Sequence, residues 1–453
     1  MTVDSRQSTV HSYGQPPMHD MERKSLGGAP WLYVHGGLRE QQSKWIPVPG
    51  KKSGDAYIME AIEKHWMPVF PAPGKEPRVL IECGSNLLRR TRMNHLVRQH
   101  LWPKLKLIVV VDFRMSSTAT QADYILPAAG WYETVGVKHQ DTKIPYSIYK
   151  GKAVEPVGES QDEWVIFAQL SKKMQELAPK MGFTTYKDEL VGITRDLSRL
   201  YDDYTERGKW PEDVDGRVML QEIMRRTKAY EGVSLEELEK KGVVSWTNAG
   251  PSEGRVYGAT SDYQVGKPYT SATYFTEKKQ PWPTLTGRQQ FYIDHDWFLE
   301  FGEELPVHRD PPKAGGDHPL RITSGHTRWG IHSQWRDNPL MLRLQRGEPL
   351  LYMSPTDAEP RGIKDADYVE VFNDVGRFCV KVMVTPAMQP TQVHIYHGWE
   401  QFMFKGHTSK ASVFASQLKP LGFVGNYGHL HYEPTYYQPN NVDKGTYVNV
   451  RKA

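Results

Sequence analysis

The chain has 453 residues, of which 38% are hydrophobic, 11% aromatic and 24% charged, values typical of a globular protein with two or three domains. A formal net charge of +4 with no dominant basic run argues against a nucleic-acid-binding surface. No window approaches about 18 consecutive apolar residues, so no direct membrane span is expected. The opening MTVDSRQSTVHSYGQPPMHD lacks an apolar signal segment and a twin-arginine pattern, so no export signal is expected in this chain.

The two cysteines, Cys83 and Cys379, are too few for a zinc cage or for the thiolates of an iron–sulfur cluster. We therefore expect any iron–sulfur group to be supplied by another polypeptide.

The first half of the chain begins with a polar stretch and continues with an alternation of strands and helices. Residues 1 to about 50 are rich in Gly and Pro without a sustained period, which predicts a loosely ordered arm. A helix is predicted from Asp55 to His65, followed by a strand, RVLIECG, at 78–84. SNLLRRTRMNHLVRQHL at 85–101 has the apolar spacing of an amphipathic helix, and LKLIVVVD at 105–112 is a second strand.

Both strands are continuous apolar runs, which predicts burial on both faces, as in a parallel sheet covered by helices. YILPA at 124–128 is predicted to be a third short strand. The fold class is therefore α/β: a Rossmann-like doubly wound module at 77–180, preceded by an arm and connecting segment at 1–76.

A long helix is predicted within SQDEWVIFAQLSKKMQEL, starting at a capping box formed by Ser160 and Glu163. Its apolar residues fall on one face: Phe167, Leu170, Met174 and Leu177.

The second half of the chain changes character twice. Residues 181–317 are charged, aromatic and irregularly helical, and SLEELEKKG at 234–242 has its own cap and terminal glycine. From 318 to 453, short β-branched runs separated by Gly, Asp and Pro predict a C-terminal β-barrel or sandwich. These runs are LRITSG, LLYMS, DYVEVFND, GRFCVKVMVTP and TQVHIYHG.

Polar residues follow the two first strands, at CGSN (83–86) and DFRMSST (112–118). In a doubly wound sheet, ligands bind at the carboxyl ends of the strands. Gly84 allows close backbone approach, Asp112 could accept two N–H donors of a guanine or bind a ribose diol, and the hydroxyls could bond phosphate oxygens. From these residues alone, a nucleotide ligand and ordinary turn capping are equally good interpretations. There is no GxGxxG, which makes NAD the weaker nucleotide.

Six ordered blocks identify a family resemblance: VLIECGSNLL, VVVDFRMSSTATQADYILPAAGWYE, QDEW, TSGHTRWGIHSQWRDNP, SPTDAEPRGIKDADYVEVFNDVG and VGNYGHLHYEPTYY. Together they resemble the dimethyl sulfoxide reductase family, whose members hold molybdenum between two molybdopterin guanine dinucleotides. DFRMSST, WGIHS and YGHLHY are most similar to the subgroup of nitrate, selenate and chlorate reductases with ethylbenzene and dimethyl sulfide dehydrogenases.

The resemblance implies two groups of cofactor-binding residues. On the Rossmann-like side, Ser85 and Asn86 would contact phosphate or ribose, and Asp112, with Arg114 and Thr118, would meet a guanosine. Asp162 occupies the family's second acidic position for that end, although QDEW departs from the commoner order DW. The C-terminal side contributes His326, Ile331, His332 and Ser333, on the loop that meets the pterins, and four further candidates: His397, His407, Asn426 and Tyr437.

Ordinary structural roles compete with these assignments, because an Asp at a strand end is usually a turn former and a His in a β-loop is usually a core residue. Trp329 and Trp399 are predicted to be packing residues rather than substrate walls.

The resemblance covers the later part of a catalytic subunit, so we expect a C-terminal half that grips the cofactor. A separate N-terminal half would supply the molybdenum ligand and the iron–sulfur cysteines, and an iron–sulfur electron-transfer subunit is an expected partner. The implied activity is oxygen-atom transfer or hydroxylation at molybdenum, in the periplasm, as part of anaerobic respiration. The alternative is a non-catalytic nucleotide-binding or regulatory module that retains the fold.

Overall fold

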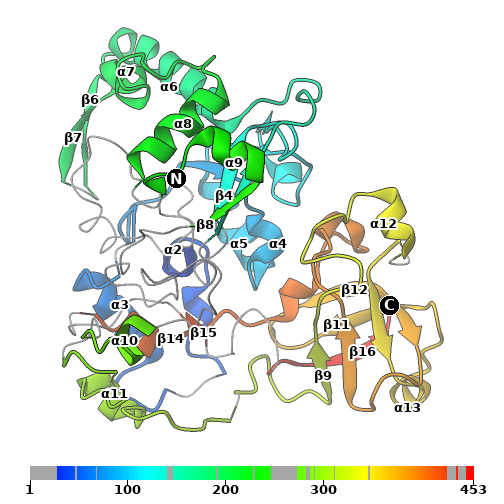
Figure 1. The fold of residues 1–453 in the computed structure, drawn as a ribbon. Coiled ribbons are helices and arrows are strands. Elements are labelled where there is room, and N and C mark those ends of the chain that lie inside the picture. The colour runs from blue at the N-terminus through cyan, green and yellow to red at the C-terminus, as the bar shows by residue number, and fades with distance from the viewer. Residues whose placement is uncertain are drawn as a thin grey trace. The chain divides into compact units, whose positions relative to one another are not determined.

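Figure 1 shows the fold of the chain in a computed structural model. It describes residues 28–45, 48–67, 69–139, 146–189, 192–227, 230–245, 273–281, 286–289, 291–310, 312–344, 347–425, 435–436 and 445–453. These residues fall into two compact units. The first combines the described parts of 1–110, 115–125 and 291–453, and the second those of 111–114 and 126–290. The four-segment division made from the sequence stays a prediction.

The three predicted strands of the Rossmann-like module form one sheet, in the order β1 (Val79–Cys83), β2 (Leu107–Asp112) and β3 (Tyr124–Pro127). The central strand β2 is the most buried, because it has a neighbour on each side. At the edge of this sheet, β1 is less buried than its apolar sequence predicts, and Val79 is 53% exposed.

The single helix predicted at 85–101 is divided into α4 (Leu87–Arg90) and α5 (Asn94–His100). Between them Met93 takes a left-handed backbone conformation, with φ of 52°, and its side chain is buried. The Met93 N–H donates to the Ala411 carbonyl at 2.9 Å, so a contact with a distant segment replaces the helical hydrogen bond there. The prediction of one continuous helix was therefore wrong.

The predicted helix at 55–65 is confirmed as α3 (Gly54–Glu63), but part of the segment before it is more ordered than expected. Helix α2 (Gly28–His35) and the short η1 (Arg39–Gln41) bury Leu32, Tyr33 and Leu38. The Tyr33 hydroxyl donates to Asp55 at 2.6 Å. Residues 28–45 are therefore part of the core and not a loose arm. Their apolar side chains are buried although they follow no sustained helical period in the sequence.

A closed six-stranded barrel confirms the β-rich C-terminal domain, with the strand order β10-β12-β11-β16-β9-β13 (Figure 1). Its strands are β9 (Leu320–Thr323), β10 (Leu350–Met353), β11 (Tyr368–Phe372), β12 (Arg377–Val384), β13 (Gln392–Ile395) and β16 (Tyr447–Lys452). Buried residues alternate along β12, as expected of a strand with one face on the core. The sequence predicted five of these strands and missed β16, which pairs with both β9 and β11 to close the barrel.

Short elements complete the first unit. The helices are α11 (Asp296–Phe301), α12 (Pro339–Leu344) and α13 (Pro355–Ala358), and β14 (Leu418–Lys419) pairs with β15 (Thr435–Tyr436). The 3₁₀ turns are η2 (Trp102–Lys104), η3 (Ala119–Gln121), η6 (Glu359–Arg361), η7 (Gln401–Met403), η8 (Lys410–Val413) and η9 (Pro420–Phe423).

The second unit combines helices with two small sheets that the sequence did not predict. One sheet contains β4 (Gly136–His139), β5 (Tyr146–Lys150) and β8 (Val243–Ser245), and the other contains β6 (Thr185–Asp188) and β7 (Ile193–Asp196). The remaining elements are α6 (Glu163–Lys180), η4 (Leu197–Arg199), α7 (Leu200–Tyr204), α8 (Gly216–Arg226), α9 (Leu235–Lys241) and α10 (Thr273–Thr276). The predicted caps of α9 are confirmed: the Ser234 hydroxyl accepts from the Glu237 N–H at 3.1 Å, and Gly242 is left-handed.

Helix α6 exists as predicted, but its start and its buried face differ. Asp162 caps it, accepting from the Trp164 N–H at 2.8 Å, in place of Ser160. The predicted apolar face is largely exposed at Leu170, Met174 and Leu177. The helix instead buries a neighbouring face of mostly small side chains, Ile166, Ala168, Ser171 and Ala178, because small residues allow closer packing.

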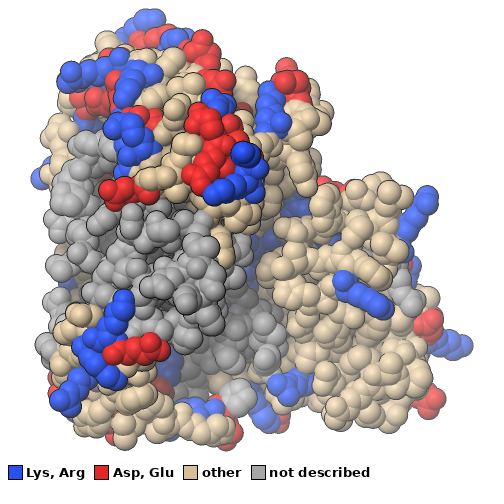
Figure 2. Space-filling model, viewed as in Figure 1, with Lys and Arg blue, Asp and Glu red and all other residues tan. Residues whose placement is uncertain are grey.

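Acidic and basic side chains are intermixed on the visible surface around α6, α8 and α9 (Figure 2). Pairs such as Lys172 with Glu212 and Arg217 with Glu239 bridge separate elements there. Among the residues placed by the structure, no helix has the length and apolarity needed to cross a lipid bilayer.

The barrel core yields a stability prediction. Leu351 is fully buried on β10, so Leu351→Ala leaves a cavity and should lower the free energy of unfolding by about 2 to 5 kcal/mol. Leu340→Ala is the matched control, since Leu340 is 68% exposed and its truncation should change stability by less than about 0.5 kcal/mol. Urea unfolding of the full chain measures both. Equal effects of the two substitutions would contradict this account of the core.

Candidate functional site

A buried carboxylate joins the strand-end loops of the Rossmann-like module to a loop beyond the barrel strand β13. The Glu400 side chain is 3% exposed, and it accepts hydrogen bonds from the Asn86 amide at 2.9 and 3.1 Å. It also accepts from the Ser117 N–H at 2.9 Å and the Ser117 hydroxyl at 2.6 Å, while the Arg89 guanidinium lies 3.6 Å away. These four residues are called the Glu400 network below. Burying a carboxylate is costly, and here the donors and the cation offset that cost.

Further hydrogen bonds extend the Glu400 network into both loops. The Gln401 N–H donates to the Ser117 hydroxyl at 2.8 Å, and the Gln401 amide donates to the Leu88 carbonyl at 3.0 Å. Thr118 is fully buried, accepting from the Leu88 N–H at 3.2 Å and donating to Asn86 at 3.3 Å. Two residues predicted to contact the cofactor, Asn86 and Thr118, therefore use these side-chain atoms to hold the loops together.

Three histidines from two loops of the first unit meet at the surface. His326 and His332 both lie on the loop between β9 and α12, and His397 follows β13. The His332 Nδ1 lies 3.3 Å from the His326 Nε2 and 3.2 Å from the His397 Nε2. His326 and His332 are exposed and His397 is half-buried. This histidine cluster consists of residues that the sequence predicted, and the fold brings all three together.

The backbone around the histidine cluster is tightly packed. Gly398 has φ of +93°, and a Cβ at this position would lie 1.9 Å from the His332 carbonyl oxygen, so no other residue fits without rearrangement. His332 itself has a left-handed φ of 51°, and the His397 N–H donates to the Gly325 carbonyl at 3.1 Å. The relative positions of the imidazoles are consequently set by the backbone.

Beneath the cluster lies a fully buried arginine that the sequence did not single out. The Arg336 guanidinium packs 4.1 Å from the Trp399 ring centroid and donates to the His397 carbonyl at 2.7 Å. Its Nε and Nη1 atoms have no hydrogen-bond partner among the described residues. Burial lowers the pKa of Arg336 to about 10, so the group is still a cation at neutral pH. Trp399 is buried, which confirms its predicted packing role, whereas Trp329 is 47% exposed.

The electrostatic surroundings of the cluster are positive. Burial, and then the cation of Lys410, hold the pKa of His397 at about 3. Burial also lowers the pKa of His332, with further contributions from His326, Arg89 and Arg90. These two imidazoles are therefore neutral at physiological pH and present lone pairs in a cationic environment.

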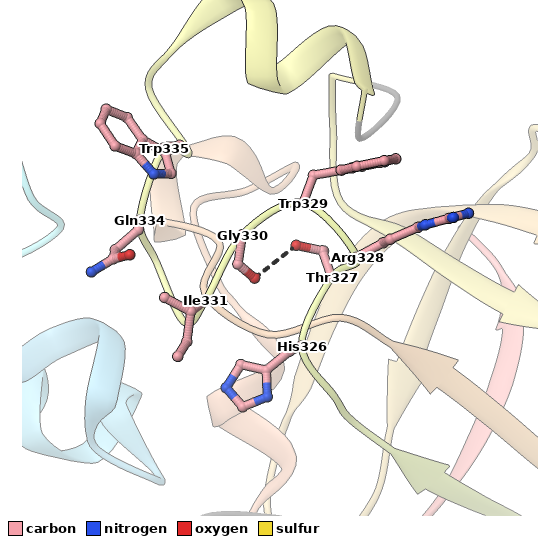
Figure 3. A pocket seen from close by; sticks show the side chains of 8 residues that line it. All are labelled: His326, Thr327, Arg328, Trp329, Gly330, Ile331, Gln334 and Trp335. Carbon is pink, nitrogen blue, oxygen red and sulfur yellow. Dashed lines mark hydrogen bonds between the residues drawn. The ribbon is translucent and has the colours of Figure 1, made fainter.

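A pocket of about 450 Å³ opens on the loop that carries two of the histidines (Figure 3). It is lined by His326, Thr327, Arg328, Trp329, Gly330, Ile331, Gln334 and Trp335. The Thr327 hydroxyl donates to the Gly330 carbonyl at 3.1 Å and so closes the turn (Figure 3). Ile331 was predicted to be on this loop's ligand side, and its side chain is 52% exposed.

In the second unit, the two predicted acidic positions lie on neighbouring backbone segments. The Asp112 carbonyl accepts from the Ala128 N–H at 3.1 Å, and the Gln161 carbonyl accepts from the Ala129 N–H at 2.8 Å. Asp112 is 9% exposed, while Asp162 uses one oxygen to cap α6. Asp162 therefore has the ordinary structural role of a helix N-cap.

The other predicted residues are placed as follows. Ser85 is half-buried beside Asn86, Ser333 is buried next to His332, and Arg114 lies 6.0 Å from the exposed Phe113 ring. His407 is exposed, and its backbone N–H donates to the Phe404 carbonyl at 3.1 Å. Asn426 and Tyr437 lie outside the described residues.

Two stretches match known protein families. Residues 63–173 match the family described as molybdopterin oxidoreductase, and residues 320–429 match the molydopterin dinucleotide binding domain. The chain belongs to the dimethyl sulfoxide reductase family of molybdopterin oxidoreductases.

Relatives of this family align along most of the chain. It is 37% identical to the respiratory nitrate reductase subunit alpha of Haloferax mediterranei, an alignment covering 93% of this chain and 43% of that protein. It is 36% identical to the perchlorate reductase subunit alpha of Dechloromonas aromatica, with the same coverage. It is 34% identical to the dimethylsulfide dehydrogenase subunit alpha of Rhodovulum sulfidophilum, covering 93% of this chain and 46% of that one. The chain thus spans less than half the length of these relatives.

The fold is also similar to a solved structure. Acetylene hydratase from Pelobacter acetylenicus aligns with a TM-score of 0.54 at 18% identity, over 96% of this chain and 53% of that one. This likeness concerns the fold alone.

The residues of the Arg336 site and the histidine cluster fit a molybdopterin dinucleotide. Such a ligand combines anionic groups with a ring rich in nitrogen donors and acceptors. The buried Arg336 offers two guanidinium nitrogens without a partner among the described residues, and Lys410 and Arg89 add positive charge nearby. The neutral imidazoles of the histidine cluster can hydrogen-bond ring nitrogens. Sequence reasoning missed Glu400, which lies two residues after the run TQVHIYHG, and Arg336, which lies within the block TSGHTRWGIHSQWRDNP.

The Glu400 network makes a prediction about donor and acceptor matching. Glu400→Gln places an amide N–H against buried donors and should destabilise the chain by about 1 to 3 kcal/mol. Asn86→Asp should destabilise the chain by at least the same amount, because it places two buried carboxylates next to each other. The double substitution restores one donor and one acceptor and should be more stable than either single variant.

Urea unfolding midpoints of the full chain test this prediction, with the exposed Glu359→Gln as the control. If Glu400→Gln shifts the midpoint no more than Glu359→Gln, the network does not stabilise the loops.

Proposed function

We propose that this chain is the cofactor-gripping half of a molybdenum oxidoreductase catalytic subunit that binds bis(molybdopterin guanine dinucleotide). One observation carries the proposal: the buried Glu400, within the match to the dinucleotide-binding domain, bonds Asn86 and Ser117, within the match to the molybdopterin oxidoreductase family. The segments of two cofactor domains are thereby held together in one unit. A rigid joint of this kind is what a shared, elongated cofactor requires.

Within this proposal, the chain's residues have separate roles. Ser85 and the backbone near Asn86 approach phosphate or ribose, and Ser333 with the histidine cluster bonds the pterin nitrogens. Arg336 neutralises an anionic group of the cofactor from below. In the second unit, Asp112 accepts the guanine N–H donors, with Arg114 and Asp162 beside it. His407, Asn426 and Tyr437 remain candidates by resemblance.

The bound cofactor supplies oxygen-atom transfer or hydroxylation at molybdenum, while the protein binds and orients it. The chain has two cysteines, which are too few to ligate an iron–sulfur cluster. We therefore assign the cluster and the molybdenum ligand to a cysteine-bearing N-terminal half. By resemblance to the family, an iron–sulfur subunit carries electrons, and the assembled enzyme works in the periplasm in anaerobic respiration.

The first test is reconstitution. The full chain alone should show no turnover with a reduced viologen dye and nitrate, perchlorate or chlorate, since it lacks cluster ligands. Co-expression with the cysteine-bearing N-terminal half should produce activity, and a half whose cysteines are replaced by serine is the control. Viologen-linked turnover by the chain alone would rule out that the N-terminal half supplies the cluster and the molybdenum ligand. Cofactor retention without activity in the pair would support a non-catalytic nucleotide-binding module instead.

A second test addresses the guanine end. Asp112→Asn replaces an acceptor with a donor facing the guanine N–H groups, at a cost of about 2 to 4 kcal/mol in binding. This corresponds to a roughly thirtyfold to thousandfold loss of affinity. Molybdenum and released guanine nucleotide are measured in the reconstituted pair at equal folded protein and limiting cofactor. The exposed Asp213→Asn in the same unit is the control. Unchanged cofactor content in Asp112→Asn would show that Asp112 is a turn residue.

A further inference from the structure

The histidine cluster has a geometry that hydrogen bonding explains poorly. A neutral imidazole nitrogen has either one proton or one lone pair, so His332 Nδ1 can form one well-directed hydrogen bond. It nevertheless has two ring nitrogens at hydrogen-bond distance, from His326 at 3.3 Å and from His397 at 3.2 Å. Three ring nitrogens that converge in this way are a ligand set.

The spacing is that of metal ligands. With Zn–N bonds of about 2.0 to 2.1 Å, tetrahedral coordination sets ligand nitrogens about 3.3 to 3.4 Å apart. The two short N···N distances in the cluster are 3.3 and 3.2 Å, and the ligand atoms of all three residues lie within 4.8 Å of one another.

The cluster is also held in place by its surroundings. The His397 carbonyl accepts from Arg336 at 2.7 Å, and its N–H donates to Gly325 at 3.1 Å. Gly398 packs directly on the His332 carbonyl. Because the backbones are fixed, little ordering entropy is lost when an ion binds, and preorganisation of this kind raises affinity.

We infer that, in the cofactor-free chain, His326, His332 and His397 form a binding site for a borderline divalent transition-metal ion of the Zn²⁺ class. Three protein ligands leave a fourth position open, and it faces solvent because His326 and His332 are exposed. The neighbouring cations Arg336, Lys410 and Arg89 favour an anion such as chloride or hydroxide in that position. The inference does not depend on the proposed function, but it has a consequence for it, since the same imidazoles cannot bind an ion and a pterin together.

The test uses the full-length, tag-free chain without cofactor, titrated with Co²⁺ and then with competing Zn²⁺. One equivalent of Co²⁺ should bind and develop the visible absorption of a tetrahedral site, and Zn²⁺ should displace it. His326→Ala and His397→Ala should each weaken binding at least about tenfold, because each removes one of three ligands. The exposed His308→Ala is the matched control and should bind as the unmodified chain does.

Thermal unfolding provides an independent measurement. Zn²⁺ should raise the melting temperature of the unmodified chain and of His308→Ala, but not of His326→Ala. Because the His326 side chain is exposed, its removal should not cause misfolding, so the lost response reports the lost ligand. Equal metal affinity in His326→Ala, His397→Ala and the unmodified chain, or no stoichiometric binding, would overturn the site. Such a result would leave the cofactor proposal unaffected, because that proposal is tested by guanine nucleotide content in the reconstituted pair.

Discussion

The burial of one carboxylate, that of Glu400, is the constraint on which the first unit depends. A buried charge is tolerated only when donors surround it, and here they come from two loops about three hundred residues earlier in the chain. Satisfying Glu400 therefore brings the segments around Asn86 and Ser117 against the segment that follows β13. The break between α4 and α5 belongs to the same packing, because Met93 leaves the helix to bond Ala411.

The same segment connects the Glu400 network to the histidine cluster. Residues 397 to 400 contribute an imidazole, a glycine without room for a side chain, a tryptophan under the Arg336 guanidinium, and the buried carboxylate. Moving any one of them would disturb the others. The buried cation of Arg336, which would ordinarily be unfavourable in the interior, lies under the neutral imidazole of His397. This arrangement suits an anionic, nitrogen-rich ligand.

The cofactor and the transition-metal ion both use the fixed lone pairs of the histidine cluster, whereas the surrounding positive charge favours the anionic cofactor and opposes the ion. They differ in what else they require. A dinucleotide also needs the phosphate and guanine contacts of the strand-end loops and of Asp112, whereas a small ion needs three nitrogens and an anion.

Local patterns in the sequence determined the strands β1, β2 and β3, five strands of the barrel and both caps of α9, because period and capping act within a few residues. Motif order also selected the three histidines and Asp112. Only the tertiary structure decided that Asn86 bonds Glu400, that Met93 interrupts a helix, that β16 closes the barrel and that Arg336 is buried beneath His397. Each of these depends on a partner dozens to hundreds of residues away. A pairing between distant segments leaves no periodic signal in either segment, so it cannot be read from the sequence. These pairings are determined by packing and by the need to satisfy buried charge.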